Sequence, residues 1–282
     1  MFSPHGEITH VSDTALLVAA CRAMETESAD GFVRDPFAAR LAGERGMAIL
    51  RAMPHAEMFR FGVGARSRFA DELVTDAVST KGIAAVVCVG CGLDTRPWRL
   101  DLPKELRWIE VDFAEMLDYK DERMAGEMPR CNRERMTADV NDAAQRRAIW
   151  EVVGAAPAMM ITEGLLMYLP RSTVQAMAAE AGVESGITYW LSDVVTSTFT
   201  KAIAMDTTKT VGHVQAPDSL EGEQIVEVVQ RHGWIPEARR SYLTDMAFAM
   251  ARVRHMMGDR AQQGPPPEAL GDPSGVHLWK RG

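Results

Sequence analysis

A short apolar segment that ends in a glycine-rich turn constrains the fold of this chain more than any other feature. Residues 84–89 read AAVVCV and run directly into Gly90-Cys91-Gly92. A strand that is apolar throughout is typical of the centre of a parallel sheet, where both faces are buried. Glycines at its carboxyl end let a ligand approach the backbone closely. The segment therefore predicts a ligand-binding turn in an open α/β sheet.

Strand-like and helical segments alternate after this turn. Further strands are expected at 106–112, 158–162 and 187–195, and helices at 114–126, 142–153 and 171–182. This alternation predicts a Rossmann-like, doubly wound and mostly parallel sheet with helices on both faces. The polar, arginine-rich residues 127–137 obscure the strand that should lie third in this series.

The segments on either side of the 83–195 core are predicted to belong to the same single domain, 1–282. Residues 1–80 are expected to form a helical cap, with Asp13 as the N-cap of its first helix. Residues 196–218 are expected to be a lid-like insertion, and 219–282 the C-terminal part of the sheet. The expected segments outside the core are helices at 11–29, 35–53, 64–79 and 220–232, a strand leading into a helix at 241–257, a loop at 262–274 and a last strand at 276–281.

Composition excludes several classes of function. The formal net charge is −8 and basic residues form no dense cluster, which argues against a nucleic-acid partner. No apolar run approaches the roughly 18 residues that span a bilayer, and residues 1–13 lack a signal pattern, so we expect no membrane association. Cys88 and Cys91 form a CxxC without the second close pair of a zinc site, so we expect packing and no metal. Free thiols favour a cytoplasmic location.

Two features narrow the class of ligand at the glycine turn. Position 95 is Thr, so the turn lacks the third glycine with which dinucleotide-binding folds accommodate a pyrophosphate. Asp112 ends the next strand, about twenty residues after the turn, where a carboxylate can accept hydrogen bonds from both hydroxyls of a ribose. A nucleoside without a pyrophosphate favours S-adenosylmethionine over NAD or FAD.

Four motifs, in order VGCGLDTRPWRL, WIEVDF, TADV and ITEGLLMYL, resemble the leucine carboxyl methyltransferase family. This is a class I S-adenosylmethionine-dependent group that includes the protein phosphatase methyltransferase and bacterial polyketide carboxyl methyltransferases. The resemblance covers residues 63–169. It implies that the glycine turn, with Gly90 and Gly92, borders the cofactor, with Gly90 against its amino-acid part. It places Asp112 on the ribose, Asp139 on the adenine amine with Val140 beside the ring, and Glu163 near the methionine end.

The resemblance also implies two residues near the reacting groups. Arg66 would bind a carboxylate of either the cofactor or the substrate, since its planar guanidinium pairs with carboxylates through two hydrogen bonds. Arg68 competes for this role. Tyr168 faces the acceptor or only packs, and the sequence leaves both open.

The chemistry favours a carboxylate of a small molecule or peptide as methyl acceptor. A carboxyl group has a pKa near 4 and needs no base at neutral pH, whereas a phenol has a pKa near 10 and benefits from one. The seven histidines lie outside the four motifs, although His213 stands in the expected lid. Two alternatives remain: a phenol or hydroxyl O-methyltransferase of a secondary metabolite, and a noncatalytic scaffold that keeps the fold.

Overall fold

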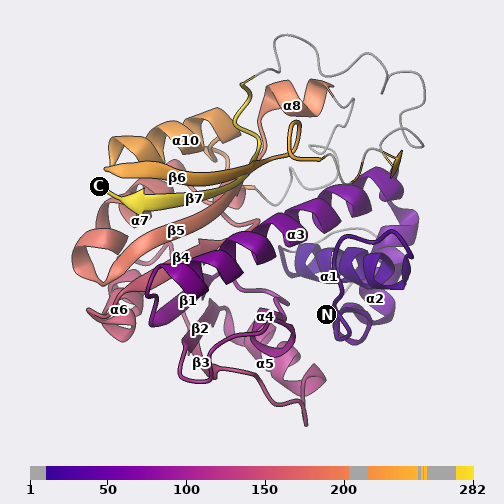
Figure 1. The fold of residues 1–282 in the computed structure, drawn as a ribbon, viewed down its shortest axis with the longest axis horizontal. Coiled ribbons are helices and arrows are strands. Elements are labelled where there is room, and N and C mark those ends of the chain that lie inside the picture. Colours follow the sequence, from indigo (N-terminus) through magenta and orange to yellow (C-terminus); the bar gives the residue numbers. More distant parts are fainter. Residues whose placement is uncertain (1–10, 203–214, 247–248, 250, 253–270) are drawn as a thin grey trace.

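The computed structural model of the 282-residue chain describes residues 11–202, 215–246, 249, 251–252 and 271–282 (Figure 1). Seven strands in this part of the chain form one sheet in the order β3-β2-β1-β4-β5-β7-β6. Strands β1 to β5 are parallel, and β7 is antiparallel to both β5 and β6. The predicted doubly wound, mostly parallel sheet is therefore confirmed. The strands are β1 (Ala85–Val89), β2 (Arg107–Asp112), β3 (Asn132–Thr137), β4 (Ala158–Thr162), β5 (Ile187–Val194), β6 (Trp234–Ser241) and β7 (Gly275–Arg281).

Helices cover both faces of this sheet and extend beyond one end of it (Figure 1). They are α1 (Val11–Glu27), α2 (Ala38–Ala52), α3 (Ala56–Thr80), α4 (Arg96–Arg99), α5 (Ala114–Arg123), α6 (Ala143–Val153), the short 3₁₀ helix η1 (Leu166–Tyr168), α7 (Arg171–Glu184), α8 (Ser197–Ala202) and α10 (Gly222–Arg231). Helices α6, α7 and α10 pack on one face, and α3 and α5 pack on the other.

The alternation of side chains along β1 shows why this strand is apolar throughout. Val87 and Val89 point into the core beneath α6, α7 and α10. Val86 and Cys88 point into the core beneath α3. All four side chains are buried, so a polar residue at any of these positions would be removed from water without a partner.

The N-terminal helices form a third apolar cluster at the carboxyl ends of the parallel strands. Helices α1 and α2 lie at the end of the sheet toward which β1 to β5 run (Figure 1). The buried Arg22 of α1 donates to the carboxylate of Asp35 at 2.9 Å and to the carbonyl of Leu93 at 2.6 Å. Asp35 also accepts from the hydroxyl of Thr95 at 2.7 Å. These contacts tie the helical cap to the turn after β1.

A buried ion pair lies beneath the same turn. Glu110 of β2 and Lys120 of α5 are fully buried, with Nζ and Oε1 2.6 Å apart, and Arg133 donates to the other oxygen of Glu110 at 2.7 Å. Burial alone would lower the pKa of Lys120, but the Glu110 carboxylate reverses this and raises it to about 12. Trp98 lies under both cations, 5.5 Å from Lys120 and 4.8 Å from Arg133. The tryptophan of the DTRPW motif therefore supports the core.

Three expectations outside the central strands need correction. Asp13 lies inside α1 and pairs with Arg45 at 3.1 Å, so it is not the N-cap. A strand was expected to begin at Ser241, but this residue is the last of β6. The sequence of β6 shows no clear strand pattern, because it contains Pro236 and several charged residues. Helix α3 begins at Ala56, before the expected residue 64. Most of the helix expected up to residue 257, of the lid-like insertion and of the 262–274 loop falls outside the described residues.

Candidate functional site

The glycine turn lies at the point where the strand order reverses. Strand β1 lies between β2 and β4. The chain passes from β1 to β2 and β3 on one side, and then returns to β4 on the other side of β1. Ligands of open α/β sheets bind at such a point, outside the carboxyl ends of the strands. Gly90 has a φ of +64°, and a Cβ atom there would come within 2.8 Å of Cδ1 of Leu165. Only glycine fits this position without strain.

The carboxylate of Asp112 joins the end of β2 to the glycine turn. Its Oδ2 accepts from the backbone N–H of Gly92 at 2.7 Å, and its Oδ1 accepts from that of Phe113 at 2.8 Å. Burial raises the pKa of Asp112, and these two hydrogen bonds oppose the rise. Each carboxylate oxygen has a further lone pair and can accept from a ligand as well. The next residue, Phe113, is 42% exposed.

Asp139 and Val140 lie next to Asp112, after the neighbouring strand β3. The backbone N–H of Ala138 donates to the carbonyl of Asp112 at 3.1 Å, which brings the two strand ends together. The Asp139 carboxylate accepts from the backbone N–H of Asn141 at 2.9 Å. Val140 is buried. The structure therefore brings together Asp112 and Asp139, the residues to which the resemblance assigns the ribose and the adenine.

Arg66 lies on the other side of the turn and bridges two strand ends. Its Nε donates to Oε1 of Glu163 at 2.9 Å, and its Nη1 donates to Oδ2 of Asp193 at 3.2 Å. Glu163 follows β4 directly, and Asp193 lies near the end of β5. Arg68, the competing candidate, pairs instead with Glu72 one turn along α3, and its side chain is 40% exposed. Of the two arginines, the structure brings Arg66 to the site.

A second arginine, to which the sequence analysis gave no role, holds Glu163 from the opposite side. Arg96 donates to Glu163 at 2.7 Å, to Asp71 at 2.7 Å and to Asp94 at 3.0 Å. Arg99 binds Asp71 through both of its terminal nitrogens. The signal was present in the sequence, because Asp94 and Arg96 stand directly after the turn in the DTRPW motif. Asp193 had no such signal, because nothing distinguishes a carboxylate near the end of β5 from ordinary strand-end polarity.

These side chains together form what we call the arginine–carboxylate cluster: Arg66, Arg96, Arg99, Asp71, Asp94, Glu163 and Asp193. Burial would raise the pKa of Asp94, but Arg96 and Lys120 outweigh it and hold the pKa at about 2. Burial likewise opposes ionisation of Glu163, yet Arg96 and Arg66 keep its pKa below the usual range. The cluster thus pairs three guanidinium groups with four carboxylates, so its formal net charge is −1. It suits a ligand with a net positive charge.

Tyr168 lies in η1, between the cluster and the helical cap. Its hydroxyl makes a side-chain hydrogen bond with Thr14 of α1, and its ring packs against the third apolar cluster. Burial raises the pKa of this phenol, with Arg66 acting in the opposite direction, so it is a neutral donor at physiological pH. The residue therefore packs and also reaches the surroundings of Arg66.

The thiol of Cys88 lies 3.9 Å from Oδ2 of Asp94, and Cys91 lies within the glycine turn. Cys88 and Cys91 are buried, and burial raises the pKa of both thiols. Burial lowers the pKa of His277 to about 4, and this imidazole bonds to the carbonyl of Pro273. The described residues contain no group of three or more His, Cys, Asp or Glu side chains that could hold a metal ion.

Comparison with known proteins agrees with the motifs. The family model of leucine carboxyl methyltransferases matches residues 15–181. The chain belongs to this family. Two relatives named "putative S-adenosyl-L-methionine-dependent methyltransferase" come from Streptomyces avermitilis (34% identical over 183 residues) and Frankia alni (35% over 184 residues). Each alignment covers 61% of this chain and 64% of the relative, less than two thirds of its length.

Solved structures support the fold. A DUF574 family protein from Streptomyces avermitilis covers 94% of this chain and 97% of its own, with a TM-score of 0.58 and 13% identity. The structure of a protein from Thermobifida fusca covers 99% of this chain and 96% of its own, with a TM-score of 0.55 and 15% identity. At such identities the similarity concerns the architecture alone.

Proposed function

We propose that this protein is an S-adenosylmethionine-dependent O-methyltransferase that converts a carboxylate of a small molecule or peptide into a methyl ester. The observation that carries the proposal is the Asp112 carboxylate, hydrogen-bonded to the N–H of Gly92 at the point where the strand order reverses. Membership of the leucine carboxyl methyltransferase family supports it independently.

The residues present fit S-adenosylmethionine by the chemistry of their donors and acceptors. Asp112 retains acceptor capacity for the two ribose hydroxyls, and Asp139 on the adjacent strand offers an acceptor for the adenine amine. Gly90 has no side chain of its own to keep a ligand from its backbone. The excess negative charge of the arginine–carboxylate cluster suits a ligand whose ammonium and sulfonium groups outnumber its carboxylate. By contrast, the buried Thr95 bonds to Asp35 where a dinucleotide site has its third glycine.

The acceptor is proposed to be a carboxylate because the described residues of the site offer hydrogen-bond donors and no suitable base. Glu163 has a lowered pKa and is a weak base. Among the described histidines, none bonds or pairs with Arg66, Glu163 or Asp193. Arg66 uses Nε and Nη1 for its two carboxylates, and its guanidinium and the neutral Tyr168 hydroxyl are the donors we assign to the acceptor.

Catalysis in this proposal rests on positioning. When bound, S-adenosylmethionine would supply a methyl group on a positively charged sulfur, and the electron pair of the broken sulfur–methyl bond would stay on this sulfur as leaving group. No proton moves, because the acceptor is already ionised at neutral pH. Arg66 and Tyr168 orient the acceptor, and alignment of two bound reactants contributes about 7–11 kcal/mol in favourable cases. The helical cap of residues 1–80 and the insertion at 196–218 are proposed to enclose the acceptor within a single methyltransferase domain.

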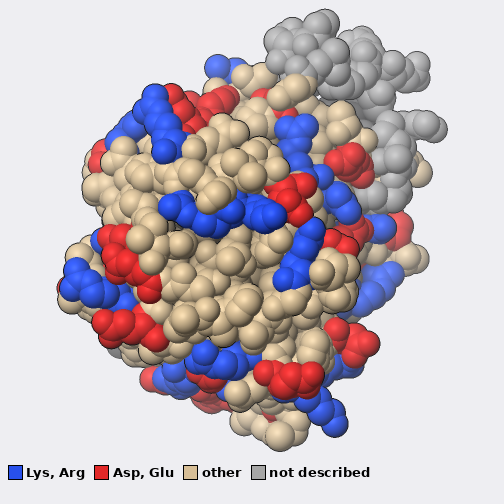
Figure 2. Space-filling view, turned by 60° about the vertical axis from the view of Figure 1, so that its left-hand side comes forward, with Lys and Arg blue, Asp and Glu red and all other residues tan. Residues whose placement is uncertain are grey.

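The charge pattern of the surface fits a small-molecule or peptide partner. On the face shown in Figure 2, basic side chains form short groups separated by acidic side chains and uncharged surface. In the described residues, no helix is both long enough and apolar enough to cross a membrane.

Transfer of a tritiated methyl group from S-adenosylmethionine to a panel of carboxylic acids, including peptides that end in leucine, tests the proposal. Methyl esters release volatile methanol in mild alkali, whereas methyl ethers of phenols do not. We expect alkali-labile product with at least one carboxylic acid, and none with the matching amides. Alkali-stable product with phenols alone would support the hydroxyl acceptor instead and contradict the carboxyl assignment.

A further inference from the structure

Tyr242, just after β6, has a buried hydroxyl without a partner. Its ring is held between two other rings: Phe69 of α3, stacked at 6.1 Å between centroids, and Phe199 of α8 at 5.8 Å. The backbone N–H of Tyr242 donates to the carbonyl of Ser274 at 3.2 Å. Yet its phenolic oxygen is shielded from solvent and makes no hydrogen bond to any described residue. A buried hydroxyl without a partner is costly, so such a group in a folded protein calls for an explanation.

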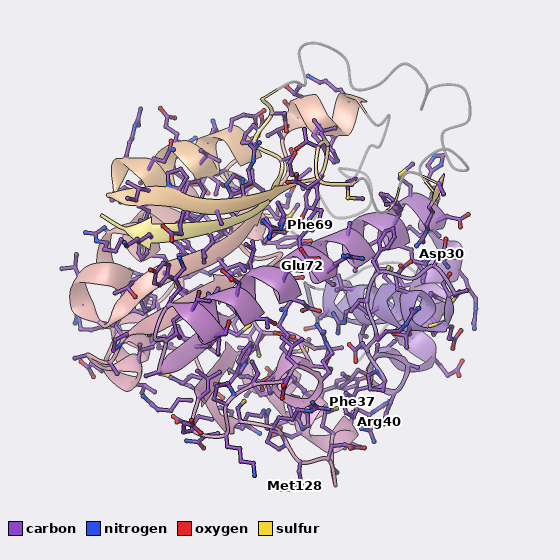
Figure 3. All side chains as sticks on the ribbon, in the orientation of Figure 1. Asp30, Phe37, Arg40, Phe69, Glu72 and Met128 are labelled. Atoms are coloured by element: carbon purple, nitrogen blue, oxygen red, sulfur yellow. The ribbon has the colours of Figure 1, made fainter. Side chains whose placement is uncertain are left out.

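The surroundings of this hydroxyl place it at the candidate site. Phe69 lies one helical turn after Arg66 on α3, so the ring stacked on Phe69 is on the same side of the helix as the guanidinium. Glu72, one turn further along α3, binds Arg240 of β6 at 3.3 Å and fixes the strand beside this helix (Figure 3). Burial raises the pKa of Tyr242 well above its usual range, and Asp193, Arg66 and Glu163 are the charged groups that act on it.

This position is on the acceptor side of the sheet. Asp112 and Asp139, the residues assigned to the nucleoside, follow β2 and β3 on one side of β1. On the other side of β1, Glu163 directly follows β4, and Asp193 lies near the end of β5. The Tyr242 hydroxyl, on which the charges of Asp193, Arg66 and Glu163 act, is therefore associated with the strand ends opposite those assigned to the nucleoside, where the proposed function places the second substrate.

We infer that Tyr242 positions the methyl acceptor: its unpartnered hydroxyl donates a hydrogen bond to a carboxylate oxygen of the acceptor, beside Arg66. The inference rests on the proposed function and adds to it a specificity-determining donor from the C-terminal part of the sheet. A phenol and a guanidinium side by side present donors to both oxygens of one carboxylate. The neutral phenol does so without adding charge to a cluster whose guanidinium groups are already paired.

The test uses Tyr242→Phe, which removes only the hydroxyl, and Tyr119→Phe as matched control. Tyr119 donates to the carbonyl of Leu41 at 2.8 Å in the helical cap, so this control loses a hydroxyl away from the site. The chain has four tyrosines, so ¹³Cζ-tyrosine labelling gives few resonances, and the one missing in Tyr242→Phe is assigned directly. Acetate is titrated at constant ionic strength into each protein, with and without saturating S-adenosylhomocysteine.

We expect acetate to shift the Tyr242 resonance, and to bind Tyr242→Phe about tenfold more weakly than the wild type or Tyr119→Phe, as loss of one hydrogen bond predicts. Affinity for S-adenosylhomocysteine should be equal in all three proteins. Equal acetate binding by Tyr242→Phe, no acetate binding by the wild type, or a resonance moved by phenol and not by acetate would each overturn the inference. Failure of S-adenosylhomocysteine to bind the wild type would instead refute the proposed function, and the acetate titration of the free protein would still decide the role of Tyr242.

Discussion

Replacing Asp112 by alanine is expected to weaken the binding of S-adenosylhomocysteine by a factor of about 100 or more. The carboxylate is the proposed acceptor for two ribose hydroxyls, and a hydrogen bond to a charged group contributes about 1.5–3 kcal/mol. It also fixes the turn, since Oδ2 accepts from Gly92 and Oδ1 from Phe113. Calorimetric titration of wild type and variant measures the effect. Thermal unfolding without ligand is expected to change little, because the lost contacts lie at the end of β2 and not in its core.

The matched control for this variant is Asp118→Ala on the adjacent helix α5. Asp118 is a carboxylate 67% exposed in its side chain and paired with Arg135 on the surface, so its loss should leave ligand affinity unchanged. Asp112→Asn keeps one side-chain oxygen as acceptor and is expected to fall between the wild type and Asp112→Ala. Wild-type affinity in Asp112→Ala, with a normal melting curve, would remove this residue from the binding site.

Replacing Glu110 by alanine is expected to lower the free energy of unfolding by about 3–5 kcal/mol, which corresponds to a melting temperature lower by roughly 10 °C. The loss is large because Lys120 would be left fully buried without its counter-ion and Arg133 would lose one of its two carboxylates. Removal of one partner of a buried pair costs far more than the pair itself contributes. Chemical denaturation and differential scanning calorimetry measure the change.

Two further variants separate this explanation from a general effect of losing a charge. Glu134→Ala removes a carboxylate from a pair with Arg107 in which both side chains are about a third exposed, and should cost about 1 kcal/mol or less. The double variant Glu110→Leu, Lys120→Met removes the buried charges together and should recover most of the stability, since Arg133 keeps Asp121 at 2.7 Å. A small loss in Glu110→Ala would show that the buried pair is not a main support of the fold.

The central part of the fold could be predicted because its residues leave little choice. Strands β1 and β4 are buried on both faces and are therefore apolar in every position except the last of β4, Thr162, and this pattern is visible in a single sequence. Strand β3 lies at the edge of the sheet, where its side chains are partly exposed, so NRERMT shows no apolar pattern. Strand β6 lies at the other edge and contains Pro236, which an edge strand tolerates but which gives no sign of a strand in the sequence.

The positions of the candidate residues were predictable where these residues end or directly follow recognisable strands, as with Gly90, Asp112 and Glu163. Arg96 was overlooked because its role depends on three carboxylates from α3, the turn and β4, which only the fold brings together. Asp193 and Tyr242 come from parts of the chain with no motif, and only burial and neighbours distinguish them. The contacts of Asp193 and Tyr242 leave no signal at fixed spacing in the sequence, whereas Asp94 and Arg96 stand together in the DTRPW motif.

Titration of the purified wild-type protein with S-adenosylmethionine, S-adenosylhomocysteine and NAD tests the central claim most directly. We expect both sulfur nucleosides to bind in the micromolar range, and NAD not to bind, because Thr95, bonded to Asp35, stands at the position of the third glycine of a dinucleotide fingerprint. Absence of binding by either sulfur nucleoside, or tight binding of NAD, would contradict the account and favour a protein that keeps the methyltransferase fold for another purpose.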